Sequence, residues 1–305
     1  MSDNTTSDIA MSDKTVSDKT MSDNTTIAKP REKRDYEKYI RFGYFPTTWC
    51  PGCSDGIILK SVAMVLSDMG IDPNDIAVVS GIGCSGRMPN YFKTNSLHTA
   101  HGRALTFATG IKFSRPEKMV IVFSGDGDAS AIGGNHLIHA ARRDIGIKLI
   151  IINNGIYGMT GGQVSPTTPQ GFFTETTTYG NLEPNFDIVK LLKGANASFV
   201  ARESINRLPQ LKMTLKKVFE HDGFAALEII SNCHVILGSR NKMRSPMALM
   251  SYIDDITYPL ERADKLTAEE KKGKIPLGIF VDRKDMKEYT DMYFNELVPI
   301  AQGRV

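Results

Sequence analysis

The stretch Ser124–Thr168, SGDGDASAIGGNHLIHAARRDIGIKLIIINNGIYGMTGGQVSPTT, decides the fold of this chain. An apolar, β-branched run from Met119 to Phe123 leads into it and predicts a buried strand. A glycine-rich turn, a helix over about 131–143 and a second buried strand over 148–152 follow. Strand, turn, helix and strand form a βαβ unit. The turn is therefore expected at the carboxyl edge of a parallel sheet, where ligands bind.

Polar groups at that edge predict a site for a metal ion and a diphosphate. Glycines let the backbone approach a phosphate, and the start of the following helix favours negative charge. Asp126 offers a carboxylate, Asn154 a side-chain oxygen and Ile156 a backbone carbonyl, which with two diphosphate oxygens fill most of the shell of Mg²⁺. The GDG turn alone is equally consistent with a tight structural turn. GDG followed by one helix, one strand and Asn-Asn is much more specific.

The chain has four cysteines, all in loops beside apolar segments: Cys50, Cys53, Cys84 and Cys233. The loops of the last two follow predicted strands, so they could face the same edge of the sheet and form a four-thiolate cage. Such a cage suits zinc or a 4Fe-4S cluster, and composition does not choose between them. For the Cys-x-x-Cys pair alone, a redox dithiol and two inert buried thiols are further alternatives.

The order of predicted elements indicates the fold class. Predicted strands over 76–80, 198–201 and 224–230 alternate with helices, one of them predicted over 95–114. This order favours an α/β fold with an open, doubly wound, mostly parallel sheet and helices on both faces.

Composition divides the chain into three parts. Residues 1–30 repeat a polar decapeptide that begins MSDNTTSDIA, and they contain too few apolar side chains to order themselves. Residues 31–238 carry the predicted sheet. Residues 239–305 show little sheet pattern and are expected to form an extension that packs on a partner subunit or covers part of the site.

Charge and hydropathy exclude some classes of partner. The net charge of +3 is too small to argue for nucleic-acid binding. No apolar run is long enough to predict a transmembrane helix, and no secretory segment is recognisable. We therefore expect a cytoplasmic protein that binds neither nucleic acid nor membrane.

Two independent sets of motifs resemble one family. GDG followed at this spacing by Asn-Asn resembles the thiamine diphosphate motif of thiamine-dependent enzymes. The full stretch, together with the spacing of the four cysteines, resembles the β subunits of 2-oxoacid:ferredoxin oxidoreductases. The segments WCPGCSDG and HGRALTFATGIK most resemble the 2-oxoglutarate type.

The resemblance implies a domain over residues 31–238 that binds thiamine diphosphate, Mg²⁺ and a 4Fe-4S cluster. It implies cluster ligation by Cys50, Cys53, Cys84 and Cys233, and Mg²⁺ ligation by Asp126, Asn154 and Ile156. It further implies that the following residues contact thiamine diphosphate: Ile82, Gly83, Cys84, Ser85, Gly125, Gly127, Asp128, Gly158 and Met159.

The implied reaction is the reversible oxidative decarboxylation of 2-oxoglutarate with coenzyme A to succinyl-CoA and CO₂, with electrons passing through the cluster to ferredoxin. Such enzymes take the glutamate that activates thiamine from an α subunit. This chain has no glutamate in a convincing motif for that role, so we expect a heterodimer and no decarboxylation by this chain alone.

Two further residues are candidates for catalysis. Arg87 lies three residues after Cys84 and is a candidate to bind the distal carboxylate of 2-oxoglutarate, because a guanidinium binds carboxylates through two hydrogen bonds. His101 is a candidate to contact substrate or cofactor. The structural alternatives are an arginine at the surface or paired with an acid, and a histidine that bonds backbone carbonyls.

Three other functions remain open from the sequence. The same chemistry could act on pyruvate or another 2-oxoacid. A thiamine enzyme without redox output would share the GDG and Asn-Asn motifs but would not need four thiolates. A zinc-stabilised phosphate-binding module would need the cysteines but not the Asp126–Asn154 pair.

Overall fold

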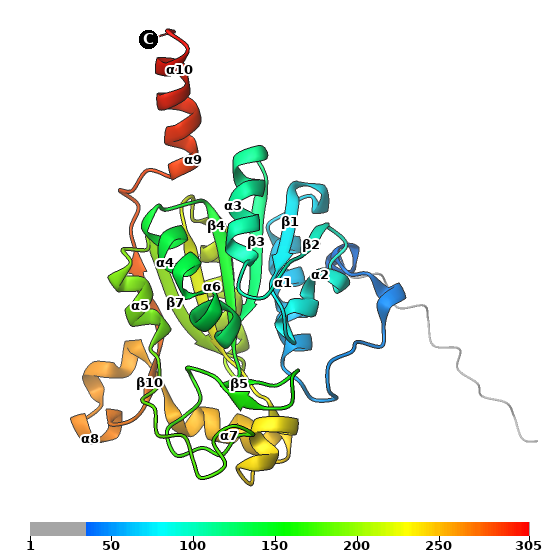
Figure 1. Ribbon diagram of the computed structural model, residues 1–305, viewed down its shortest axis with the longest axis vertical. Coiled ribbons are helices and arrows are strands. Elements are labelled where there is room, and N and C mark those ends of the chain that lie inside the picture. The colour runs from blue at the N-terminus through cyan, green and yellow to red at the C-terminus, as the bar shows by residue number, and fades with distance from the viewer. Residues whose placement is uncertain (1–34, 305) are drawn as a thin grey trace, which may run out of the picture. The chain divides into compact units, whose positions relative to one another are not determined.

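The computed structural model describes residues 35–304, so the predicted decapeptide repeats lie outside the described residues. Its centre is an eight-stranded sheet in the order β2-β1-β3-β4-β8-β7-β10-β9 (Figure 1). The strands are β1 (Ile76–Ser80), β2 (Asn95–His98), β3 (Met119–Gly125), β4 (Ile147–Asn153), β7 (Phe199–Ser204), β8 (Ala225–Ile230), β9 (Thr257–Pro259) and β10 (Ile275–Asp282). Neighbours from β2 to β7 run parallel, and β10 runs antiparallel to β7.

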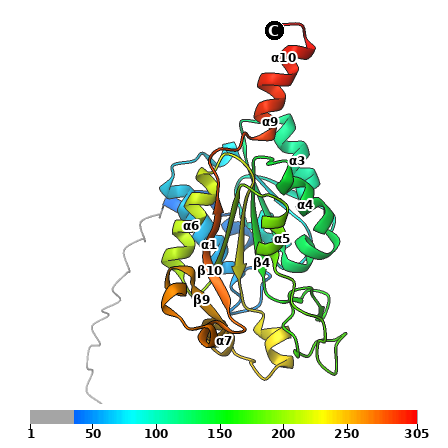
Figure 2. The same ribbon diagram turned by 90° about the vertical axis from the view of Figure 1, so that its left-hand side faces the viewer.

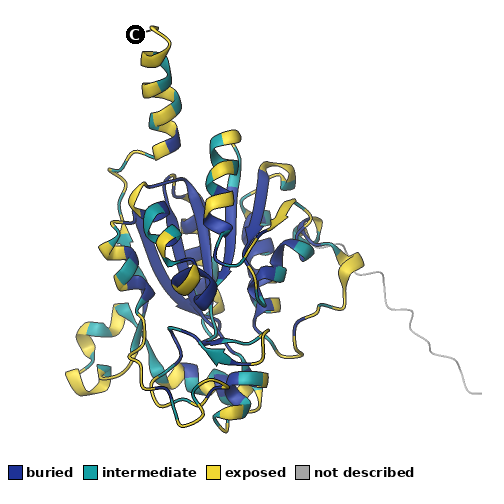
Figure 3. Ribbon diagram, in the orientation of Figure 1, coloured by how far each residue is buried: buried dark blue, intermediate teal, exposed yellow. Residues whose placement is uncertain are grey.

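Helices cover both faces of the sheet, which confirms the predicted doubly wound α/β fold. One face is covered by α1 (Asp55–Asp68) and α6 (Leu208–Glu220), and the other by α3 (Ala104–Ser114), α4 (Gly134–Arg142) and α5 (Ile188–Gly194). Figure 2 shows these two helix layers on either side of the sheet. Because both faces are covered, the central strands β1, β3, β4 and β8 are almost wholly buried and apolar (Figure 3).

The remaining α-helices and strands are mostly short. They are α2 (Met88–Tyr91), β5 (Ile156–Tyr157), β6 (Gln163–Val164), α7 (Pro246–Ile256), α8 (Ala268–Lys271), α9 (Tyr289–Met292) and α10 (Val298–Ala301). Figure 1 shows β5 and α7 at the edge where β4 ends, and α9 and α10 beyond the opposite edge. Within residues 35–304, no helix is both long and apolar enough to cross a membrane.

The helix predicted over 95–114 was wrong in its first half. Residues 95–98 form β2, an edge strand that pairs with β1 and whose four residues are all exposed. An exposed edge strand carries no apolar periodicity, so the sequence does not reveal it. The helix begins only at Ala104, because Gly102 has a positive φ of 69°, which a helix does not allow.

The expectation of little sheet in residues 239–305 was also wrong in one respect. β10 extends the sheet by pairing with β7, and the segment belongs to the same compact unit as the rest of residues 34–305. Pro276, Gly278 and a register shift between Ile279 and Val281 interrupt the alternation that normally predicts a strand. Packing of this segment on a partner subunit stays a prediction.

Candidate active site

Four neighbouring parallel strands end at four loops that each carry at least one predicted metal ligand. Cys84 follows β1, Asp126 follows β3, Asn154 follows β4 and Cys233 follows β8. Parallel strands that share one edge bring these loops together, as the sequence predicted.

A cavity of about 180 Å³ lies at this edge. Its lining includes every residue predicted to contact thiamine diphosphate: Ile82, Gly83, Cys84, Ser85, Gly125, Gly127, Asp128, Gly158 and Met159. The three predicted Mg²⁺ ligands and His101 also line it. We call it the thiamine cavity. The structure therefore brings these residues together, and their contacts with a cofactor stay predictions.

Asp126 is buried, and its carboxylate is held by the loop that follows β6. Its Oδ2 accepts hydrogen bonds from the hydroxyls of Ser165 and Thr167, the latter at 2.6 Å. Burial raises the pKa of Asp126, and the two hydroxyl bonds act in the opposite direction. Close by, the Asn154 side-chain oxygen accepts the Ile156 N–H at 3.3 Å, which folds the turn between two of the predicted ligands. Carboxylate, amide and carbonyl oxygens are the donor types that Mg²⁺ prefers, so this set fits the ion.

The second glycine of the GDG turn, Gly127, is needed for close packing. A Cβ at Gly127 would lie 2.3 Å from the ring of Tyr157, far inside van der Waals contact. The Tyr157 hydroxyl donates to the Gly127 carbonyl at 3.1 Å, so the ring closes over the turn. Tyr157 also lines the thiamine cavity and was not singled out from the sequence.

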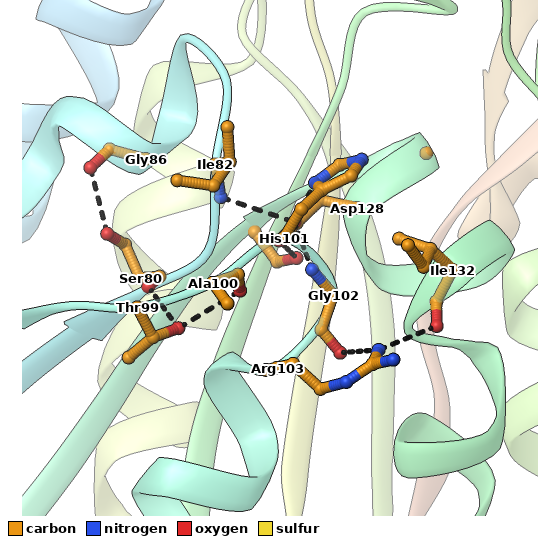
Figure 4. A network of polar contacts seen from close by, with 12 residues as sticks. Ser80, Ile82, Gly86, Thr99, Ala100, His101, Gly102, Arg103, Asp128 and Ile132 are labelled. Carbon is orange, nitrogen blue, oxygen red and sulfur yellow. Dashed lines mark hydrogen bonds and ion pairs between the residues drawn. The ribbon is translucent and has the colours of Figure 1, made fainter.

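Asp128 joins three loops of the site (Figure 4). Its Oδ1 accepts hydrogen bonds from His101 Nδ1 at 2.6 Å, from the Gly102 N–H at 2.7 Å and from the Ile82 N–H at 3.2 Å. Its Oδ2 accepts a hydrogen bond from the Ser124 hydroxyl. The Asp128 carboxylate therefore binds four donors of the protein itself, and it holds the His101 imidazole through Nδ1. The other ring nitrogen of His101, Nε2, is the one left to contact a ligand.

The four cysteines line a second cavity of about 60 Å³, which we call the thiol cavity. All four are free thiols, and Cys50 is exposed. Within residues 35–304, no three metal-binding side chains stand at the spacing of a formed metal site. Burial, followed by the nearby carboxylate of Asp55, raises the pKa of Cys53 and raises that of Cys84 to about 12. Thiols this reluctant to ionise need a bound cation to become thiolate ligands.

Two hydrogen bonds tie the Cys-x-x-Cys loop to the other cysteine loops. The Trp49 indole N–H donates to the Cys84 carbonyl at 2.8 Å, and the Asn232 side-chain N–H donates to the Gly52 carbonyl at 3.2 Å. Three segments far apart in sequence are thus held together with their thiols toward one cavity. A set of four thiols converging in this way fits an iron–sulfur cluster or zinc.

The two cavities share a wall. Cys84, Asn154 and Met159 line both of them. A Cβ at Gly158 would lie 3.4 Å from the sulfur of Cys233, so the predicted diphosphate loop rests directly on a predicted cluster ligand.

Arg87 lies in the thiol cavity and not in the thiamine cavity. It ends the 3-10 turn Ser85–Arg87. None of the ion pairs among residues 35–304 involves it. Its positive charge lowers the pKa of Cys84, against the effect of burial. Binding of a substrate carboxylate by Arg87 stays a prediction.

Comparison with known proteins identifies the family. Residues 81–229 match the family described as thiamine pyrophosphate enzyme, C-terminal TPP binding domain. The chain is 47% identical over 254 residues to the 2-oxoglutarate synthase subunit KorB of Methanothermobacter thermautotrophicus, covering 83% of this chain and 89% of that protein. The chain belongs to the family of 2-oxoglutarate synthase β subunits.

Two further relatives agree with this family. The 2-oxoacid:ferredoxin oxidoreductase subunit beta of Saccharolobus solfataricus is 34% identical over 270 residues, covering 84% of this chain and 85% of the relative. The solved 2-oxoglutarate:ferredoxin oxidoreductase from Magnetococcus marinus, with 2-oxoglutarate, coenzyme A and succinyl-CoA bound, is 31% identical with a TM-score of 0.77. That match covers 89% of this chain and 92% of the solved chain, which confirms the resemblance seen in the sequence.

Proposed function

We propose that this chain is the β subunit of an enzyme that oxidatively decarboxylates 2-oxoglutarate with coenzyme A, giving succinyl-CoA and CO₂ and passing electrons to ferredoxin. Membership of the family and the names of its relatives support the reaction. When bound, thiamine diphosphate supplies the nucleophile and the electron sink, and a 4Fe-4S cluster supplies one-electron transfer.

In this proposal, the loops after β3 and β4 hold the diphosphate end of the cofactor. The GDG turn brings backbone close to the phosphates, and Asp126, Asn154 and the Ile156 carbonyl bind Mg²⁺ between them. His101, whose Nδ1 donates to Asp128 at 2.6 Å, presents its free Nε2 to the thiamine cavity, where it can accept a hydrogen bond from cofactor or substrate.

The shared wall of the two cavities is the observation that carries the redox part of the proposal. A thiamine enzyme without redox output has no use for four thiols directly beside the cofactor. Here one cysteine, Cys84, lines both cavities, and the loop of Gly158 rests on Cys233. A donor and an acceptor held on two sides of one wall suit electron transfer.

The visible spectrum of the anaerobically purified αβ complex tests this function, recorded before and after addition of 2-oxoglutarate and coenzyme A. We expect a broad iron–sulfur band that bleaches with the substrates. A complex carrying a Cys84→Ser substitution in this chain serves as the control and should lose both the band and its iron. A band absent from the unaltered complex, with zinc present instead, would exclude the redox function.

Pyruvate is the second candidate substrate, because the thiamine chemistry is the same for both 2-oxoacids. Bleaching with pyruvate and not with 2-oxoglutarate would keep the reaction and change the substrate. We further propose that the α subunit supplies the activating glutamate, so this chain alone should show no decarboxylation even when loaded with cofactors. Turnover by the isolated chain would contradict that assignment.

A further inference from the structure

The Ser-Pro-Thr-Thr segment after β6 contacts the predicted Mg²⁺ site, although no sequence motif assigned it a role. Ser165 and Thr167 both direct their hydroxyls at the same oxygen of Asp126, Oδ2. Both residues are buried, with exposed fractions of 2% and 6%, so water does not compete for these bonds. Neither hydroxyl donates to Oδ1, the other oxygen of the carboxylate.

We propose that Ser165 and Thr167 are positioning residues that fix the Asp126 carboxylate so that its Oδ1 faces the metal. The inference rests on the proposed function, because it assumes that Asp126 binds Mg²⁺. A buried carboxylate held by two donors at one oxygen has lost its freedom to rotate before the ion arrives. Such preorganisation lowers the entropic cost of binding.

Thr167 lies against Asn153, which a series of buried and partly buried hydrogen bonds holds in place. The one proton of the Thr167 hydroxyl goes to Asp126, the nearer acceptor at 2.6 Å. The Thr167 hydroxyl lies 3.0 Å from the side-chain oxygen of Asn153, the first residue of the Asn-Asn pair. The Asn153 side-chain N–H donates to Glu228 at 2.7 Å, and the other oxygen of Glu228 accepts a hydrogen bond from Arg202 Nε at 2.7 Å. Arg202 also donates to Asp187 at 2.7 Å.

This series of hydrogen bonds gives a role to the buried ion pair of Glu228 and Arg202. Glu228 and Arg202 are only 2% and 5% exposed, and a buried ion pair is a poor source of net stability. A pair of this kind is well suited to hold a polar side chain in one orientation. Here it holds Asn153, which in turn contacts the hydroxyl that holds Asp126. The first asparagine of the motif is thereby assigned to positioning and the second, Asn154, to the metal.

The test compares Mg²⁺ binding by variants of the complete αβ enzyme. Metal is removed with a chelator, thiamine diphosphate is added in excess, and Mg²⁺ is titrated by calorimetry. Thr167→Val removes the hydroxyl at nearly constant volume and should weaken Mg²⁺ binding about 10- to 100-fold, the usual effect of losing a residue that orients a metal ligand. Thr167→Ser keeps the hydroxyl and should restore most of the affinity.

Thr174→Val is the matched control. Thr174 is equally buried, and its hydroxyl bonds to Thr177 and not to Asp126. Unchanged Mg²⁺ affinity in Thr167→Val, or an equal loss in Thr174→Val, would overturn the proposal. If Thr167→Val does not fold, Ser165→Ala is the second variant, and wild-type affinity there would equally refute it. Failure of the unaltered enzyme to bind Mg²⁺ with thiamine diphosphate would instead refute the proposed function.

Discussion

Replacing Asp128 should separate the three loops that meet at the site. Its carboxylate accepts four hydrogen bonds, from the Ile82 N–H, His101, the Gly102 N–H and the Ser124 hydroxyl. The bonds from Gly102 and Ser124 are buried, and those from Ile82 and His101 are partly buried. Asp128→Ala removes all four acceptor contacts, whereas Asp128→Asn keeps an oxygen of similar size and loses the charge.

The size of each effect follows from these contacts. A buried donor left unpaired costs about 1–3 kcal/mol and a half-exposed one less, so Asp128→Ala should lower the free energy of unfolding by about 4 kcal/mol. In Asp128→Asn the Ser124 hydroxyl can turn to accept from the new amide. The three hydrogen bonds at Oδ1 remain, but they are weaker because their acceptor is no longer charged. We expect this weakening to cost about 2 kcal/mol for the three bonds together.

Thermal unfolding of the complete αβ enzyme measures both variants. For a large domain, 1 kcal/mol shifts Tm by about 2–4 °C, so we expect losses of roughly 4–8 °C for Asp128→Asn and about twice that for Asp128→Ala. Asp75→Asn is the control, because Asp75 is exposed and its ion pair with Lys118 should change stability by less than about 1 kcal/mol. If both Asp128 variants melt within 2 °C of the wild type, roughly the effect expected of the control, the carboxylate does not hold the loops together.

Three further predictions concern other parts of the chain. Gly127→Ala places a Cβ 2.3 Å from the Tyr157 ring and should weaken thiamine diphosphate binding at least about tenfold by calorimetry, since overpacking costs about 1–3 kcal/mol; unchanged affinity would show that the ring moves freely. Arg87→Ala should raise the KM for 2-oxoglutarate far more than the KM for pyruvate in steady-state assays, and equal effects would remove Arg87 from the substrate pocket. Burial lowers the pKa of Lys148 from 10.5 to about 8, so the folded protein loses this proton before the unfolded one does. The free energy of unfolding of the wild type should therefore rise between about pH 8 and 10.5, by at most about 3 kcal/mol. Urea unfolding of Lys148→Met should show no such rise. If the free energies of unfolding of both proteins change with pH in the same way, the prediction is wrong.

The sequence predicted the central sheet because its strands are buried on both sides and read as unbroken apolar runs. It predicted the thiamine cavity because glycines, carboxylate and amide follow those strands at fixed spacing. It did not predict β2 or β10, since the first is exposed and the second is interrupted by Pro276 and Gly278.

The contacts of Ser165 and Thr167 were also missed, for a different reason. Hydroxyl residues after a strand and turn are common, and nothing in their spacing shows that they reach back across the edge to Asp126. Contacts of this kind depend on how a loop folds over the sheet. Arg87 illustrates the same limit, because its distance of three residues from Cys84 did not reveal on which side of the shared wall it would lie.

The order of the strands explains why the two cavities must touch. Cys84 follows β1 and Cys233 follows β8, and β3 and β4 lie between them. Three strand spacings separate β1 from β8, about 14 Å in all, too far for two thiols to share one metal centre at the level of the sheet. Their loops must therefore bend toward each other over the ends of β3 and β4, which are the positions of Asp126 and Asn154. A cluster held by both loops, as proposed, would have to sit against the proposed metal–diphosphate site, so the proximity of the two cavities follows from the strand order itself.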